Sequence, residues 1–204
     1  MIIRLSDYRR IYQILTAIIE SEELDSTHAC VCYSFFGAIV LRDHFRVEPK
    51  VCVGFAAYCL SEDGVSVAFW EEAVREGKVP ASGFHCWIEV DGWAIDFMAP
   101  RFGDLVANEI SLEPAMFQRR LNEMNLHANS LRKVGEFCLR HEDEWVDEIL
   151  RPVIDHPGWQ DLANHASGWF KKPPKKIPTA MASVGSDGKL RPIEIRPISI
   201  RPRW

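Results

Sequence analysis

The stretch HCWIEVDGWAID, residues 85–96, decides the fold because it predicts a tight β-hairpin. Asp91-Gly92 lies between two apolar-rich runs, and a two-residue type I′ turn requires positive φ at both central positions, which this dipeptide tolerates. The resulting register puts His85 and Asp96 on one face as diagonal neighbours, within reach of a hydrogen bond. The opposite face is expected to be the core and contains Cys86, Ile88, Val90, Trp93, Ile95 and Phe97.

A histidine held by a carboxylate has two interpretations. Its tautomer is fixed and its protonated form is stabilised, which suits it to act as a general base. The same pair could instead be a half-buried polar contact that supports the sheet. The catalytic interpretation therefore requires a nucleophile elsewhere in the chain.

Cysteine is the candidate nucleophile, because the sequence contains no Gly-x-Ser-x-Gly motif. Residues 28–44 predict a helix that begins near residue 28 to 30 and is apolar almost all round, hence central and buried. A thiolate at a helix N-terminus has a lowered pKa, and the unpaired amides there can bind an oxyanion. Cys30 lies at the expected start of this helix and is favoured, whereas Cys32 points to another side and is the alternative.

The remaining segments predict a mixture of helices and strands in one domain, residues 1–170. Strand patterns precede the hairpin, and helical patterns dominate residues 101–170. The predicted elements are a helix at 6–22 capped by Ser6, strands at 47–60 and 65–70, a short helix at 71–77, and helices at 111–124 (with Pro114 in the first turn), 142–153 and 156–170.

Residues 171–204 form a basic, Pro-rich C-terminal segment, named the strap below. Its nine Lys/Arg and two Asp/Glu give +7, whereas the body, with 15 basic and 27 acidic residues, carries −12. Proline cannot donate to a sheet ladder, so the repeat RPIEI and RPISI predicts edge strands or an extended strap docked through its isoleucines. A strap lying on an acidic body is favoured over a nucleic-acid arm, because no aromatic stacking series is interleaved with the basic residues.

Composition narrows the class of protein. The 204 residues are 47% hydrophobic and 26% charged, as in ordinary globular domains. No apolar run reaches 18 residues, and charges interrupt every apolar run near the N-terminus, so neither a membrane span nor a signal peptide is expected. Six cysteines on apolar segments are expected to be free thiols in a reducing compartment, which favours the cytoplasm.

Residues 28–100 resemble the transglutaminase-like and arylamine N-acetyltransferase-like branch of the papain-like cysteine enzymes. The resemblance is carried by Cys30 opening a buried helix, by His85 in HCWIEV, by Asp96 in AIDFMAP, and by Leu41-Arg42 eleven and twelve residues after the cysteine. The second half and the strap look like neither enzyme, which indicates a separate bacterial family on this core. The missing Arg-Gly-Gly before the cysteine and the short His-to-Asp spacing argue against acetyl-coenzyme A.

The resemblance implies an α+β, papain-like/transglutaminase-like fold with a Cys30-His85-Asp96 triad. Cys30 would be the nucleophile, His85 the base and Asp96 the group that orients His85, with Glu89 as the fallback. The chemistry would be hydrolysis of a small-molecule or peptide amide, or acyl transfer to an amine. No cofactor, metal or membrane partner is expected, nucleic acid is disfavoured, and no oligomeric state is specified.

Alternatives to this assignment stay open. A metal could bind soft ligands from His28, Cys30 and Cys32 together with His85 and Cys86, although no Cys-x-x-Cys or His-Glu-x-x-His spacing is present. A binding protein could keep the same fold with the triad buried and inert. The oxyanion donors are also open, and the candidates are the Cys30 amide, Thr27, His28 and Trp87.

Overall fold

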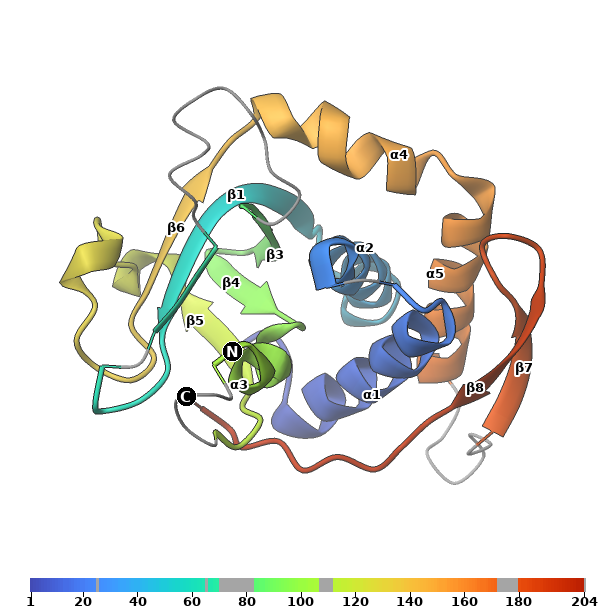
Figure 1. Ribbon diagram of the computed structural model, residues 1–204, viewed down its shortest axis with the longest axis horizontal. Coiled ribbons are helices and arrows are strands. Elements are labelled where there is room, and N and C mark those ends of the chain that lie inside the picture. Colours follow the sequence, from blue (N-terminus) through green and yellow to red (C-terminus); the bar gives the residue numbers. More distant parts are fainter. Residues whose placement is uncertain (25, 65, 70–82, 107–111, 172–179, 204) are drawn as a thin grey trace.

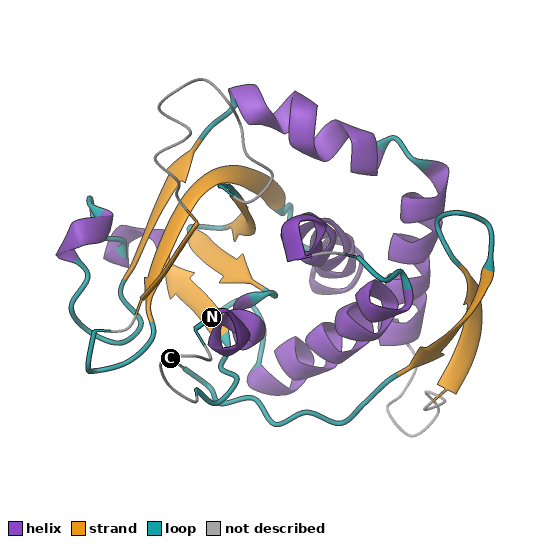
Figure 2. Ribbon diagram, in the orientation of Figure 1, coloured by secondary structure: helices purple, strands orange, loops and turns teal. Residues whose placement is uncertain are grey.

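The computed structural model describes residues 1–24, 26–64, 66–69, 83–106, 112–171 and 180–203. It combines helices with an antiparallel sheet, as expected (Figure 1). Figure 2 shows the sheet on one side of the molecule and the long helices on the other, with α2 at the centre. No helix within these residues is long and apolar enough to cross a bilayer.

The elements follow one another from helices to sheet and back to helices. In chain order they are α1 (Leu5–Ser21), α2 (Ser26–Phe45), β1 (Lys50–Cys59), β2 (Ser66–Phe69), β3 (His85–Val90), β4 (Trp93–Asp96), the 3₁₀ turn η2 (Ala99–Arg101), α3 (Phe102–Leu105), β5 (Phe117–Arg120), the 3₁₀ turns η3 (Leu121–Glu123) and η4 (Ala128–Ser130), β6 (Phe137–His141), the π-helical η5 (Val146–Leu150), α4 (Arg151–Ile154), α5 (Pro157–Lys171), β7 (Ala180–Val184) and β8 (Leu190–Glu194).

The main sheet is built around the predicted hairpin. Its strand order is β2-β1-β3-β4-β5, with β6 paired to β1, and every neighbouring pair is antiparallel. Val90 faces Trp93, and positive φ at Asp91 (49°) and Gly92 (76°) forms the turn. The predicted hairpin and its register are therefore confirmed.

The apolar face of the hairpin is part of the core, as expected, but the opposite face is buried as well. Trp87, Ala94 and Asp96, on the face assigned as polar, are as inaccessible as Ile88 and Ile95 on the other. On one side, α2 approaches the hairpin at Ile88 and Phe97. On the other, the aromatic rings of Tyr58 and Phe102 pack against His85.

Residues 101–170 are less helical than predicted. The prediction of a helix at 111–124 is wrong. In this region β5 pairs with β4, and the short turn η3 follows β5. A further strand, β6, pairs with β1 and was not predicted. Tertiary pairing overrides local propensity here, because β1 and β4 offer edges that these segments complete. The helices expected at 142–153 and 156–170 are confirmed as η5 with α4 and as α5.

Near the N-terminus, the predicted helix at 6–22 and strands at 47–60 and 65–70 are confirmed with shifted bounds, as α1, β1 and β2. Ser6 does not cap α1, since the helix begins at Leu5 after Arg4. The helix expected at 71–77 lies outside the described residues.

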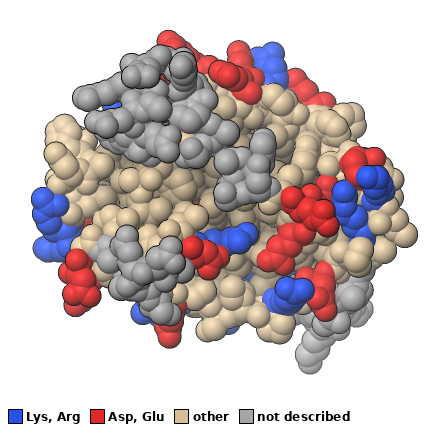
Figure 3. Space-filling view, viewed as in Figure 1, with Lys and Arg blue, Asp and Glu red and all other residues tan. Residues whose placement is uncertain are grey.

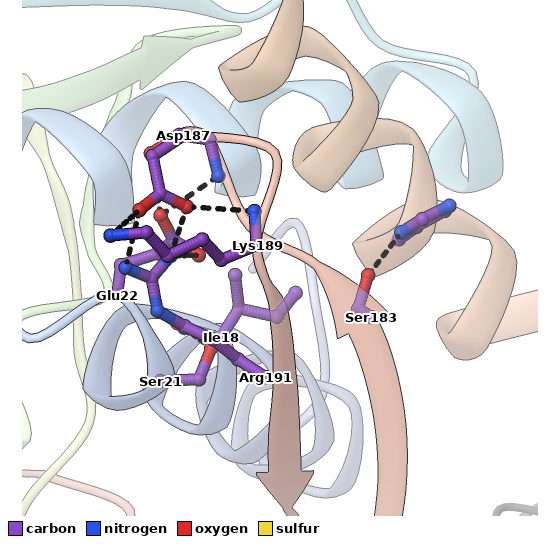
Figure 4. Close-up of polar contacts among 9 residues, drawn as sticks. Ile18, Ser21, Glu22, Ser183, Asp187, Lys189 and Arg191 are labelled. Atoms are coloured by element: carbon purple, nitrogen blue, oxygen red, sulfur yellow. Dashed lines mark hydrogen bonds and ion pairs between the residues drawn. The ribbon is translucent and has the colours of Figure 1, made fainter.

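The strap docks on the body through buried isoleucines and one buried carboxylate. Its β7–β8 hairpin lies beside α1 and continues to a bridge between Arg201 and Ala115 (Figure 1). Ile193 and Ile200 are buried in the core. At the end of α1, Glu22 accepts hydrogen bonds from Ser186 (3.0 Å from N, 2.5 Å from Oγ). Figure 4 shows Glu22 beside Arg191, whose guanidinium lies 3.4 Å from the carboxylate.

On one face of the molecule, positive and negative charges are interspersed. On the face shown in Figure 3, Lys and Arg side chains lie beside Asp and Glu side chains. Ion pairs join the strap to the body at Arg191–Glu22 and Arg201–Glu113. This pattern fits a strap bound to an acidic body.

Close packing of α2 on the hairpin predicts opposite effects for two glycine substitutions. A Cβ at Gly37 would lie 2.4 Å from the Phe97 ring, whereas a Cβ at Gly168 in α5 would meet nothing within 4 Å. Gly37→Ala should destabilise the protein by about 1–3 kcal/mol through overpacking. Gly168→Ala should stabilise it by up to about 1 kcal/mol, because alanine favours the helix. Urea unfolding measures both, and equal effects would contradict the packing argument.

Candidate active site

His85 and Asp96 form a buried pair. His85 is the first residue of β3 and Asp96 the last residue of β4, so the hairpin register sets their separation. The Nε2 atom of His85 lies 2.7 Å from Oδ2 of Asp96, and both side chains have 0% exposure. The predicted contact between these two residues is confirmed.

The Asp96 carboxylate has further hydrogen bonds that compensate its burial. The Tyr58 hydroxyl donates to Oδ2 (2.9 Å), and the Met98 amide donates to Oδ1 (2.9 Å). The Tyr8 hydroxyl donates to the Asp96 carbonyl. Burial, followed by the charge of Asp96, raises the pKa of both tyrosines, so they remain protonated donors. A buried carboxylate needs such donors to stay charged.

Cys30 lies further into α2 than predicted. The helix begins at Ser26, so Cys30 is its fifth residue and its amide belongs to the regular i→i−4 ladder. The expectation that Cys30 opens the helix and offers an unpaired amide is therefore wrong. The helix begins about one turn before the predicted start, so the helix dipole acts on Cys30 only weakly.

The acidity of Cys30 comes instead from its neighbours on β3. A hydrogen bond from the Cys86 thiol is the largest effect; burial opposes it, and the hydrogen bond and charge of His85 add to it. Together they lower the pKa of Cys30 to about 5. Burial is the largest single effect on the pKa of His85 and lowers it, but the charge and hydrogen bond of Asp96, together with those of Cys30, outweigh burial and raise that pKa to about 9. At neutral pH this corresponds to a thiolate beside an imidazolium.

The pKa values of the neighbouring thiols, Cys32 and Cys86, are raised instead of lowered. Burial raises the pKa of Cys32, and the charge of Cys30 adds to this effect. Burial and the hydrogen bond to Cys30 likewise raise the pKa of Cys86. Of the two cysteines that the sequence offered as nucleophiles, the thiolate therefore resides on Cys30.

Several other sequence candidates lie apart from this group. Glu89, the fallback orienter, binds Trp87 Nε1 (2.9 Å) and His141 (2.8 Å) instead of His85. Trp87 is thereby engaged and does not act as an oxyanion donor. The side chains of Thr27 and His28 lie outside the described residues.

The metal ligands suggested by the sequence are not the ones that the structure gathers. Among the described residues, the group of three whose ligand atoms lie within 4.8 Å of one another is Cys52, Glu89 and His141.

Tyr8 and Tyr58 were missed as partners of Asp96, since the pairing of their elements with the hairpin has no local signal in the sequence.

The group is closed to solvent. Cys30 is 3% exposed, and the Phe69 ring stacks on His85 with centroids 4.1 Å apart and an interplanar angle of 16°. A pocket of about 550 Å³ lies elsewhere, over β1 and β6, and its lining includes Phe55, Leu126 and Cys138 but none of the three residues Cys30, His85 and Asp96.

These features define a mixed α/β protein in which a curved antiparallel sheet holds a buried Cys-His-Asp group against a central helix (Figure 1). The chain belongs to the family described as "Protein of unknown function (DUF2026)", whose model matches residues 4–204. It is similar to a solved chain described as "The crystal structure of genomics APC5867", with 32% identity, a TM-score of 0.87, and coverage of 100% of this chain and 98% of that one. No curated protein matches it.

The pKa of Cys30 predicts a thiolate at neutral pH. Because this pKa is lowered to about 5, the thiolate should persist at neutral pH and disappear as the pH falls through that value. Its ultraviolet absorbance should be present in the wild-type protein and in Cys32→Ser, and absent from Cys30→Ser. A thiolate signal that appears only at alkaline pH would contradict the ion pair.

Proposed function

We propose that this protein is a cysteine-dependent acyl-transfer enzyme that hydrolyses an amide bond of a small molecule or peptide. Cys30 is the nucleophile, His85 the acid and base, and Asp96 the positioning residue. The fold is of the papain-like/transglutaminase-like type, and the six cysteines, none of which forms a disulfide among the described residues, favour a reducing compartment such as the cytoplasm.

One observation carries the proposal: the two ring nitrogens of His85 face different partners. Nε2 is bonded to Asp96, whereas Nδ1 is buried and has no nitrogen or oxygen partner among the described residues. Nδ1 is thus the nitrogen left for the Cys30 thiol, with which His85 shares a hydrogen bond. A base that is oriented on one side and holds a nucleophile on the other is the arrangement of a catalytic triad.

The chemistry follows from the ion pair. The thiolate attacks the amide carbonyl carbon, and the imidazolium gives its proton to the departing nitrogen as the C–N bond breaks. A thioester with Cys30 remains. Water then loses a proton to His85 and attacks the thioester, which releases the acid and restores the thiolate beside the imidazolium. An amine in place of water would give transamidation.

The papain-like assignment is supported by the order of elements. A central helix carries the cysteine, and the histidine and aspartate follow on adjacent antiparallel strands. This order matches the resemblance over residues 28–100.

A binding protein with an inert triad is the second candidate function, and the burial of the group favours it. The side chains of His85 and Asp96 have no exposure, and Phe69 covers the imidazole. In that case the thiolate would exist without acylation. The two functions differ in whether an acyl group can reach Cys30.

Acylation of Cys30 separates the two functions. With an activated aryl ester such as p-nitrophenyl acetate, the wild-type protein should release nitrophenol in a burst and gain one acetyl group on Cys30 by mass spectrometry. Cys30→Ser should do neither, while Cys138→Ser should behave as wild type because Cys138 lines the pocket over β1 and β6, whose lining includes none of Cys30, His85 and Asp96. No adduct in the wild-type protein, despite a thiolate, would support the binding protein.

Asp96 should set the pH range of this reaction. Acylation by an amide such as a p-nitroanilide requires the thiolate, present above about pH 5, and the imidazolium that protonates the departing nitrogen, present below about pH 9. In Asp96→Asn the charge that raises the His85 pKa is lost, so the alkaline limb should move to lower pH. The rate should fall by roughly 10²–10⁴-fold.

Tyr58→Phe is the matched control, because it removes one hydrogen bond to Asp96 but keeps the charge. It should move the alkaline limb far less than Asp96→Asn does. Equal shifts in the two variants, measured as acylation rate against pH, would contradict a positioning role based on charge.

A further inference from the structure

A second cluster of reactive side chains lies on the sheet, and the triad does not use it. Cys52 is in the middle strand β1, opposite Trp87 of β3. Glu89 faces Lys50, two residues before Cys52, and His141 of β6 faces Gly54, two residues after it. Glu89 and His141 are therefore diagonal neighbours of Cys52 on its two sides, and all three side chains share one face of the sheet.

The three side chains converge. Glu89 Oε1 and His141 Nε2 are 2.8 Å apart, so these side chains meet above the strand that carries Cys52. One ligand atom from each of the three residues lies within 4.8 Å of the other two. Tetrahedral bonds to zinc of about 2.0–2.3 Å place ligand atoms about 3.3–3.7 Å apart. Side-chain rotations that move the ligand atoms by roughly 1 Å therefore suffice to bring the three residues into this geometry.

The surroundings orient these groups as outer-shell residues orient metal ligands. Trp87 Nε1 donates to Glu89 Oε1 (2.9 Å), which fixes the carboxylate and leaves its second oxygen available. The Trp87 and His141 rings meet edge to face, with centroids 5.3 Å apart. Such contacts typically fix the orientation of ligating carboxylates and imidazoles.

From this geometry we propose that Cys52, Glu89 and His141 form a binding site for a divalent cation of the zinc type, separate from the Cys30 group. One sulfur, one nitrogen and one oxygen ligand suit Zn²⁺, and water completes the tetrahedron. The His141 side chain is 37% exposed and that of Glu89 19%, whereas Cys52 is 1% exposed, so the cation enters past the imidazole. The sequence predicted no metal because this cluster depends on the order of three strands.

Protons are exchanged when the cation binds. An ordinary cysteine is protonated at neutral pH, so the free site holds a thiol. The cation bonds to sulfur as the thiolate, and the thiol proton passes to solvent. Affinity should therefore rise as the pH increases, because binding releases this proton.

Titration with Co²⁺, which reports on zinc sites by its colour, tests the site in the untagged full chain. The wild-type protein should bind one Co²⁺ with a thiolate-to-cobalt charge-transfer band, and one equivalent of Zn²⁺ should remove the band. Cys52→Ser should lose the band. His141→Ala, a change at an exposed residue, should weaken binding by at least about 100-fold, since loss of an outer-shell contact alone costs about 10- to 100-fold.

Two thiol variants serve as controls. Cys30→Ser removes the thiolate of the candidate active site, and Cys138→Ser removes a partly exposed thiol on β6. Both should keep the wild-type band and affinity. Melting curves without metal identify any variant that fails to fold. If Cys52→Ser fails to fold, the Co²⁺ affinity of His141→Ala decides whether the proposal holds.

Two results would overturn the proposal. These are no band at stoichiometric Co²⁺ and a band that survives Cys52→Ser. If the surviving band is lost in Cys30→Ser, the cation binds at the Cys30 group instead.

Discussion

The buried carboxylate of Asp96 is the constraint on which the rest of the structure depends. A charge without solvent must be matched by donors, and each donor comes from a different element: His85 from β3, Tyr58 from β1 and the Met98 amide from the start of η2. Tyr8 of α1 binds the carbonyl of the same residue. The hydrogen bonds of this one residue, through its carboxylate and its carbonyl, thus fix a helix and three strands relative to one another.

The buried thiols show that partners, rather than burial, decide acidity. Cys32, Cys52 and Cys86 are as inaccessible as Cys30, and burial raises the pKa of each of the three. Cys30 differs because a thiol and an imidazole both donate to it, and the imidazole is charged through Asp96. The short side chain of Gly37 lets α2 approach the hairpin closely enough for these contacts.

Local chemistry explains which parts of this fold could be predicted. The hairpin follows from Asp91-Gly92, since the turn fixes its own register, and the contact of His85 with Asp96 comes with it. The strands β5 and β6 could not be predicted because their stability comes from the edges of β4 and β1. For the same reason the partners of Asp96 on α1 and β1, and the Cys52 cluster, have no signal in the sequence. The start of α2 was misplaced by one turn, which changed the argument for Cys30 from the helix dipole to its neighbours on β3.

Gly54 explains how one sheet can hold two distinct groups of reactive side chains. His85 faces Gly54 from β3, and His141 faces it from β6, so two histidines flank a single residue of β1. A Cβ at position 54 would lie 2.0 Å from the carbonyl oxygen of Arg140, so only glycine lets β6 pair closely at this point. Each imidazole then turns to its own carboxylate, His85 to Asp96 and His141 to Glu89. Because the first pair is buried and the second reaches solvent, the same residue types are suited to different chemistry: an internal ion pair in one case and, in the proposed cation site, a set of ligands open to solvent in the other.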